Sequence, residues 1–193
     1  MSALVHLIRH ARHAELGDVL SGRSDIGLSP EGRHQAEALG RWAAARPIGA
    51  VFSSPRRRAC ETAGALGLPV SVDERLDEID FGLWTGRPFA QLAADPDWTR
   101  WNEAREAARP PEGETMAAAT ARAVACVEAR SAAATPGPVV LVSHCDIIRG
   151  VVAHYLGLSL DRLLAFDVDP ASVTTLSVGG WGGRLVQLNE RPA

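Results

Sequence analysis

The sequence contains no lysine: all 20 of its basic residues are arginines, against 23 aspartates and glutamates. This absence excludes a P-loop, whose lysine reaches the nucleotide phosphates, and any mechanism that begins with a lysine Schiff base. Anions must therefore be bound by arginine, histidine or backbone N–H groups. The formal net charge of −3 gives no reason to expect nucleic acid or an anionic membrane surface as a partner.

Cysteine and long apolar runs are also scarce. The three cysteines, Cys60, Cys126 and Cys145, are too few and too scattered for a disulfide framework. No segment reaches the ~18 apolar residues that a membrane helix requires, and the first ten residues lack the apolar stretch of a signal peptide. We therefore expect a cytoplasmic protein without a membrane partner. A length of 193 residues fits one domain with a substantial core.

Signals for strands and helices alternate along the chain. The helix expected over 28–45 begins with Ser29 as its N-cap, followed by Pro30 at the first helical position. The other expected elements are strands over 3–8, 48–54, 69–73 and 137–144, helices over 55–66, 113–134 and 145–158, and a closing hairpin over 172–189. This order predicts an α/β protein: a three-layer α/β/α sandwich with a mainly parallel central sheet.

The helix over 55–66 and the stretch that follows the strand 69–73 carry further local signals. The helix over 55–66 has Ser54 as its expected cap and Pro55 in its first turn. The polar stretch 74–113 has no strand signal, and within it Trp98 and Trp101 could either cap a pocket or shield the core.

Polar side chains follow three of the predicted strands. These pairs are Arg9-His10, Ser53-Ser54 and Ser143-His144. In open α/β sheets, ligands bind beyond the carboxyl ends of the strands. If the three strands are neighbours, one pocket collects Arg9, His10 and His144 together with Arg58 from the start of the following helix.

Guanidinium and imidazole groups near a helix start suit a phosphoryl group, because arginine binds phosphate oxygens in a bidentate manner and the helix dipole favours an anion. From the residues alone, the stretch 6–16 leaves three interpretations open: a solvated basic loop, a metal site built from His10 and His13, or a nucleophilic histidine beside a phosphate-binding cation. The metal site is disfavoured because no further ligands stand at helical or hairpin spacing. We interpret Arg12 and His13 as exposed residues of the pocket rim.

Five ordered segments carry a family resemblance: LIRHA (7–11), GRSDIGLSPEGRHQAEALG (22–40), FSSPRRRACETA (52–63), LDEIDFGLWTG (76–86) and VLVSHCDIIR (140–149). From residue 4 to about residue 189 the chain resembles the histidine phosphatase superfamily. That superfamily includes cofactor-dependent phosphoglycerate mutases, broad-specificity phosphatases and α-ribazole phosphatases. The resemblance implies a phosphoglycerate mutase-like fold in a single domain over 1–193, with a short pocket-covering segment around 86–113.

The resemblance also implies roles for individual residues. His10 resembles the phosphorylated nucleophile and Glu78 the proton donor and acceptor. The positions that resemble phosphate-binding residues are Arg9, Arg58 and His144, and those that fall where relatives line the substrate pocket are Gly22, Arg23 and Ser53. Consecutive arginines on a helix point about 100° apart, so of the run 56–58 only Arg58, which matches the motif, is expected to face the anion.

Two departures from the family pattern stand at the site. Ala11 replaces the usual glycine after the first Arg-His pair, which is harmless only if its backbone has a negative φ. Cys145-Asp146 replaces two glycines after the second histidine. We interpret Cys145 as a packing residue and Asp146 as an additional carboxylate near the pocket, suited to a first helical turn.

The predicted activity is hydrolysis of a small phosphomonoester through a phosphohistidine on His10, without a cofactor or a metal. One alternative is a phosphoglycerate mutase, which is disfavoured because the segment between Gly86 and Gly113 is short. The other is a catalytically silent module that binds a phosphorylated ligand, whose expected sign would be the loss of His10 or Glu78. A homodimer remains open.

Overall fold

The computed structural model describes residues 2–133 and 136–193. Its strands form one six-stranded sheet in the order β3-β2-β4-β1-β5-β6. The strands are β1 (Ser2–Arg9), β2 (Ala50–Ser53), β3 (Val70–Val72), β4 (Val139–Ser143), β5 (Val173–Gly179) and β6 (Gly182–Glu190). Strands β3, β2, β4 and β1 are parallel to one another. Strand β5 pairs antiparallel with β1, and β6 pairs antiparallel with β5. The predicted mainly parallel sheet is confirmed.

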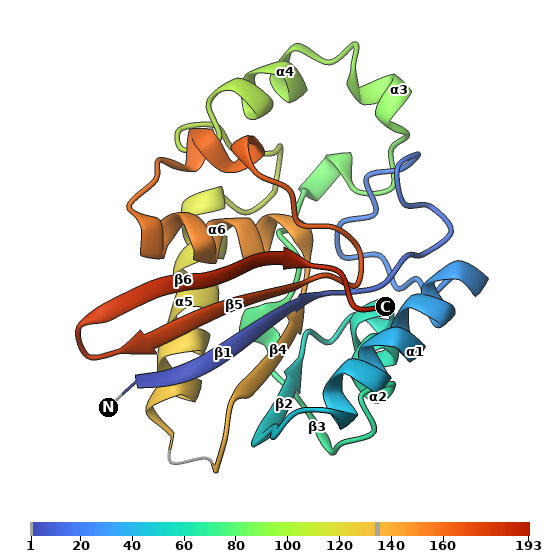
Figure 1. The fold of residues 1–193 in the computed structure, drawn as a ribbon. Coiled ribbons are helices and arrows are strands. Elements are labelled where there is room, and N and C mark those ends of the chain that lie inside the picture. The colour runs from blue at the N-terminus through green and yellow to red at the C-terminus, as the bar shows by residue number, and fades with distance from the viewer. Residues whose placement is uncertain (1, 134–135) are drawn as a thin grey trace.

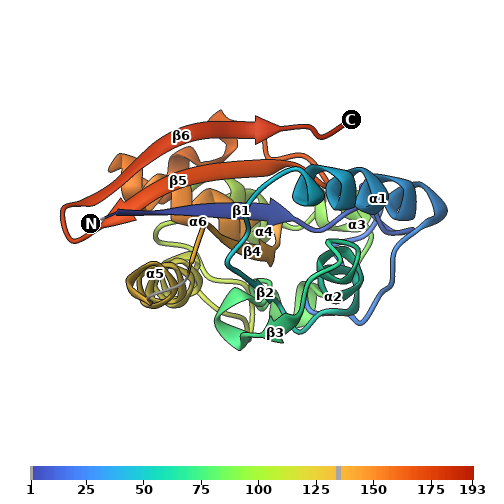
Figure 2. The same cartoon turned by 60° about the horizontal axis from the view of Figure 1, so that its bottom comes forward.

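Helices cover both faces of this sheet. The helices that pack on the sheet are α1 (Pro30–Ala44), α2 (Arg57–Gly64), α5 (Met116–Ala132) and α6 (Cys145–Leu156). Figures 1 and 2 show α1 and α2 on one face, with α5 and α6 on the other. Among the described residues, no helix combines the length and apolar character needed to span a bilayer.

The two faces bury separate cores because successive residues of a strand point to opposite sides of the sheet. On β1, Ile8 packs with the α1 and α2 residues, whereas Leu7 packs with those of α5 and α6. All five residues of β4 are buried. A central strand covered on both faces therefore reads as an unbroken apolar run, which is why 137–144 is the clearest strand signal in the sequence.

The helix starts agree with the sequence at one site and differ at another. Ser29 is the N-cap of α1 and its hydroxyl accepts a hydrogen bond from Gly32 N at 3.0 Å, as predicted. The prediction that Ser54 caps α2 is wrong, because the N-cap is Arg56 and its side chain makes no capping bond. The Ser54 hydroxyl instead contacts His144. The helix predicted over 113–134 corresponds to α5, which runs from Met116 to Ala132; its predicted end at 134 lies outside the described residues.

The stretch 74–113 contains short helices and no strand, as expected from its lack of a strand signal. They are η1 (Glu74–Leu76), η2 (Gly82–Trp84), α3 (Phe89–Leu92) and α4 (Pro96–Glu103), and a further one, η3 (Leu160–Ala165), follows α6. Trp101 is fully buried and packs edge-to-face against Trp84, and Trp98 packs on the same cluster. Both tryptophans therefore shield the core.

The segment after β1 lies beside residues 86–89 of this stretch, on the right of Figure 1. Val19 and Pro88 form an antiparallel bridge, Gly86 N donates to Leu20 O at 2.8 Å, and Phe89 N donates to Asp18 O at 2.9 Å. Two chain segments far apart in sequence thus pair to form the wall above the carboxyl ends of the strands.

Gly32 in α1 allows the helix to approach this wall closely. A Cβ atom at Gly32 would lie 1.9 Å from the carbonyl oxygen of Arg12. That carbonyl already accepts hydrogen bonds from the Ser29 backbone and hydroxyl. The start of α1 and the segment that follows His10 are therefore in backbone contact, and a larger residue must push them apart.

We predict that Gly32→Ala lowers the free energy of unfolding by about 1–3 kcal/mol, the usual cost of overpacking a closed contact. Urea denaturation measures this change. Gly64→Ala is the matched control, because a Cβ at Gly64 meets nothing within 4 Å, and it should be neutral or stabilise by up to about 1 kcal/mol. Equal effects of the two substitutions would contradict the close contact at Gly32.

Candidate active site

The three predicted strand ends meet at one edge of the sheet, because β4 lies between β2 and β1 with all three parallel. A cavity of about 470 Å³ opens there. Its wall includes the catalytic candidates Arg9, His10, Arg58 and Glu78, and the candidate pocket residue Gly22. His144 is fully buried directly beside them, with its ring centroid 5.1 Å from that of His10.

The hydrogen bonds of His10 define its tautomer. Its Nδ1 lies 2.9 Å from the carbonyl oxygen of Ala11, which can only accept, so Nδ1 carries the proton. Nε2 is left with its lone pair and accepts a hydrogen bond from Arg58 Nε at 3.3 Å. Burial, followed by the charges of Arg58 and Arg9, holds the pKa of His10 well below its usual value. His10 is therefore a neutral imidazole whose Nε2 is available as a nucleophile.

Arg58 connects the two histidines to the loop that follows residue 21. The guanidinium donates to the carbonyl oxygens of Gly22 at 2.6 Å and Ser24 at 2.9 Å, and it also contacts His144 Nδ1 at 3.1 Å. Its neighbours in the arginine run point elsewhere: Arg57 pairs with Glu61 and Arg56 with Asp77, both outside the cavity wall. The structure thus brings only Arg58 of the three to the site.

His144 is supported by a chain of hydrogen bonds that the sequence did not reveal. Because Nδ1 accepts from Arg58, Nε2 carries the proton and donates it to Ser54 Oγ, 2.7 Å away. The Ser54 hydroxyl in turn lies 3.4 Å from Asp77 Oδ1, which accepts from it. The carboxylate at the end of this chain would stabilise a positive charge on His144 when an anion binds. Ser54 could have been found as the next residue of the same strand end.

Glu78 is held beside these histidines with its carboxyl mostly buried. Its Oε2 lies 3.7 Å from His144 Nδ1, and its Oε1 accepts from Ile79 N at 3.0 Å. The pKa of Glu78 is raised to about 7, mainly because the carboxyl is buried and secondly because the negative charge of Asp146 lies nearby. Unlike an ordinary glutamate, this carboxyl is therefore protonated below about pH 7 and can donate that proton.

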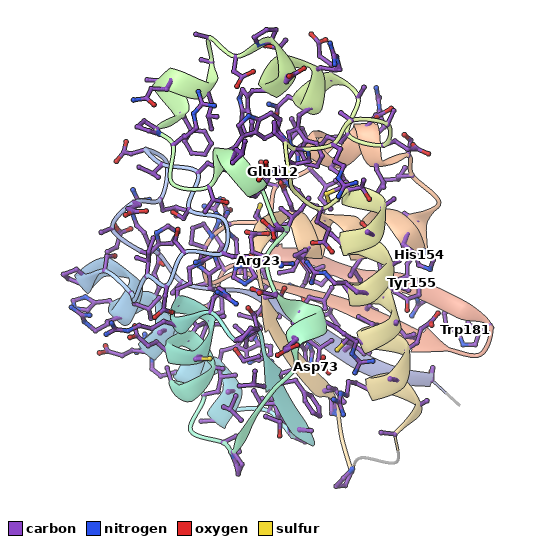
Figure 3. The ribbon with its side chains drawn as sticks, turned by 180° about the vertical axis from the view of Figure 1, so that it is seen from behind. Arg23, Asp73, Glu112, His154, Tyr155 and Trp181 are labelled. Carbon is purple, nitrogen blue, oxygen red and sulfur yellow. The ribbon has the colours of Figure 1, made fainter. Side chains whose placement is uncertain are left out.

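Two sequence-predicted pocket residues do not reach the cavity wall. Arg23 turns away and lies beside the segment joining η1 to η2, as labelled in Figure 3. There its Nε donates to the backbone carbonyl of Glu78 at 2.9 Å, a bond that Arg122 duplicates at 3.1 Å. The side chain of Ser53 is fully buried and donates to Ser54 O. Arg23 thus positions Glu78 from behind the site.

His13 differs from its expected place. The interpretation of Arg12 as a rim residue agrees with its side chain, which is 44% exposed and paired with Glu31. His13 is only 3% exposed and lies in the cavity wall, its ring 5.4 Å from that of His10. An antiparallel bridge to Leu28 turns this part of the chain inward. No group of three or more His, Cys, Asp or Glu side chains within 2–133 and 136–193 is arranged to hold a metal ion.

The two departures from the family pattern are accommodated locally. Ala11 has a negative φ and its N–H donates to Thr62 Oγ1 at 3.0 Å, so it carries no backbone strain. Asp146 stands in the first turn of α6, lines the cavity and forms ion pairs with Arg105 at 2.8 Å and Arg149 at 3.5 Å. Burial raises the pKa of the Cys145 thiol to about 11, which supports its interpretation as a packing residue.

Comparison with known proteins agrees with this geometry. The chain matches the histidine phosphatase superfamily (branch 1) over residues 5–191. It is 29% identical to phosphoserine phosphatase 1 of Hydrogenobacter thermophilus, with 95% of this chain and 90% of the relative covered. It is 34% identical to glucosyl-3-phosphoglycerate phosphatase of Mycolicibacterium vanbaalenii, with 81% and 75% covered.

A solved mycobacterial glucosyl-3-phosphoglycerate phosphatase superposes with a TM-score of 0.85 at 31% identity, covering 98% of this chain and 99% of the other. The same enzyme in complex with inorganic phosphate gives a TM-score of 0.83 at 32% identity, covering 98% of each chain. The protein therefore belongs to the histidine phosphatase superfamily, and the predicted family and fold class are confirmed. The phosphatases among its relatives support the predicted phosphomonoesterase activity.

The raised pKa of Glu78 predicts the pH dependence of catalysis. The acid must be protonated, so kcat/KM for an alkyl phosphate should fall as pH rises through about 7, while the lowered pKa of His10 keeps it neutral on the acidic side. Asp146→Asn removes a negative charge near Glu78, which lowers its pKa and should move this fall to lower pH.

Asp167→Asn is the matched control for this experiment, because Asp167 lies 4.0 Å from the same Arg149 but its side chain is 85% exposed. It should leave the pH profile unchanged. A profile of Asp146→Asn that superposes on the wild-type profile, in a variant with unchanged thermal stability, would show that Asp146 does not act on Glu78.

Proposed function

We propose that this protein hydrolyses a small phosphomonoester through a phosphohistidine on His10. The observation that carries the proposal is the pairing of a neutral imidazole, whose unprotonated Nε2 contacts Arg58, with a carboxyl whose pKa is raised to about 7, so that it is protonated below neutral pH. These are the nucleophile, charge clamp and general acid that the reaction needs.

In the first step, His10 Nε2 attacks phosphorus in line with the leaving oxygen. The N–P bond forms as the P–O bond to the leaving group breaks, and Glu78 gives its proton to that oxygen. Arg9, Arg58 and His144 hold the other phosphoryl oxygens and stabilise the developing charge. Arg9 is oriented by a hydrogen bond that its Nη1 donates to Val168 O at 2.7 Å.

In the second step, water attacks the phosphohistidine. Glu78, now a carboxylate, takes a proton from this water as the new P–O bond forms and the N–P bond breaks. Phosphate leaves, and the protonated Glu78 and neutral His10 are regenerated. Because the side chains supply both the charge clamp and the proton transfer, we propose that the reaction is independent of metal ions.

The lining of the cavity is suited to a substrate with a small organic leaving group. Beside the charged residues it presents the apolar side chains Leu16, Val19, Leu20, Phe81 and Phe89. The relatives that act on phosphoserine and glucosyl-3-phosphoglycerate indicate metabolites of this size. Both relatives are phosphatases, which favours hydrolysis over mutase activity. We further propose that residues 1–193 act as a single domain in the cytoplasm.

We predict a covalent intermediate on His10. Brief incubation with a ³²P-labelled phosphomonoester, followed by a quench in base, should leave acid-labile, base-stable label on the wild-type protein and none on His10→Ala. Protein stripped with EDTA and dialysed should be labelled equally. Label retained by His10→Ala would exclude this nucleophile, and labelling restored only by Zn²⁺, Mg²⁺ or Mn²⁺ would contradict metal independence.

We predict that Glu78→Gln affects substrates according to their leaving groups. The substitution removes the proton, which matters for an alkoxide but little for nitrophenolate, a good leaving group. General acid catalysis contributes ~10²–10⁴-fold, so kcat/KM should fall in that range for an alkyl phosphate and far less for p-nitrophenyl phosphate.

Arg58→Ala is the comparison variant, because loss of a charge clamp should slow both substrates alike. Equal slowing of the two substrates by Glu78→Gln would mean that Glu78 binds substrate or supports the fold. The proton donor would then have to be another carboxyl near the site.

A further inference from the structure

His13 is a buried imidazole in the cavity wall that the mechanism above does not use. Its ring lies 5.4 Å from that of His10, and the residue is 3% exposed. Its Nδ1 is buried and has no hydrogen-bond partner. Polar atoms buried in folded proteins nearly always have a partner. His13 lines the active-site cavity, and the lack of a partner for its Nδ1 among the described residues points to a ligand that contacts this ring.

The backbone around His13 is fixed on both sides, so the position of the ring is built into the fold. His13 bridges Leu28, its carbonyl oxygen accepts from Leu16 N at 3.2 Å, and the preceding N–H of Arg12 donates to Gln35 Oε1 at 2.9 Å. These bonds tie the segment after β1 to the start of α1. They hold the imidazole toward the cavity rather than toward solvent.

The charges that face His13 are positive. They come from Arg58 on α2, Arg9 at the end of β1 and the adjacent Arg12, with the neutral ring of His10 alongside. Burial and these three arginines lower the pKa of His13 to about 4. In the free protein it is neutral and can donate one hydrogen bond. A group that enters between these residues with negative charge would gain from all of them.

We propose that His13 is a further phosphoryl-binding residue, which donates a hydrogen bond to a phosphoryl oxygen in the substrate complex and in the phosphohistidine. This inference rests on the proposed function of His10. His13 keeps its proton throughout, while the N–P and P–O bonds change as described above. The second Arg-His pair of the sequence thereby extends the anion site formed by the first.

His6 provides a matched control within the same strand and loop region. It is also buried, and burial likewise lowers its pKa to about 4. Its Nδ1 is hydrogen-bonded to Thr175 Oγ1 at 2.9 Å, and its ring packs edge-to-face on Trp42. His6 thus has the protein partner that His13 lacks, and it lies outside the cavity wall.

The experiment compares wild type with His13→Ala, His13→Gln and His6→Gln, using inorganic phosphate and orthovanadate as the probes. Hydrogen bonds to charged groups predict that His13→Ala weakens binding of both anions about ten- to a hundredfold. His13→Gln, whose amide can donate, should retain part of the affinity. His6→Gln should bind both anions as wild type does, even where its thermal stability falls.

Wild-type protein gives an independent measurement that needs no variant. NMR titration should show the pKa of His13 rising from about 4 when phosphate binds, because an anion favours the protonated ring. The pKa of His6 should not change. Wild-type anion affinity in a folded His13→Ala, or a His13 pKa that ignores phosphate, would overturn the proposal.

Failure of the proposed function has a separate signature. If wild-type protein forms no phosphohistidine and hydrolyses no phosphomonoester, the catalytic assignment of His10 fails. The anion titrations would still report whether His13 binds phosphate.

Discussion

The buried guanidinium of Arg58 is the contact on which the geometry of the site depends. Arg58 is 1% exposed, and its guanidinium donates to two backbone carbonyls and two imidazole nitrogens, all neutral acceptors. Burying a charge is costly unless it is compensated. Because these acceptors satisfy its N–H groups without neutralising it, the site retains a positive charge that an incoming phosphoryl group can meet.

The same bonds also fix the protonation states of the two histidines. A guanidinium can only donate, so the nitrogen it contacts on each ring must be an acceptor. This places the His10 proton on Nδ1 and the His144 proton on Nε2. Replacing Arg58 would therefore remove a charge and also release both rings from their tautomers. Close packing of the two rings would not by itself select these tautomers.

Burial of the pocket acts on the nucleophile and the acid in opposite directions. A dry environment disfavours the charged form of any group, so it lowers the pKa of His10 and raises that of Glu78. One physical condition thus yields a neutral base and a protonated acid at the same pH. The segments around Leu20 and Phe89 line the same cavity, so they contribute apolar side chains to the surroundings of both groups.

Sequence patterns predicted the strand ends well and the side-chain directions poorly. A buried central strand and a Ser-Pro helix start are local signals, and the three strand ends near His10, Ser53 and His144 follow from them. Whether a loop residue faces in or out depends on which distant segment it pairs with. The bridge to Leu28 turns His13 inward, and the carboxylates beyond Glu78 draw Arg23 away. The spacing of residues near His13 or Arg23 in the sequence does not predict either of these distant partners.

Asp146 shows how one departure from a family pattern can connect two parts of the structure. The carboxylate of Asp146 pairs with Arg105 from the stretch 86–113. Arg105 is itself buried, with its guanidinium 5.6 Å from the ring centre of Trp101. The ion pair therefore fastens the start of α6 to the segment that shields the core. Because Asp146 also raises the pKa of Glu78, the residue that holds this segment in place also helps to keep a proton on the Glu78 carboxyl, the proton that the proposed mechanism uses.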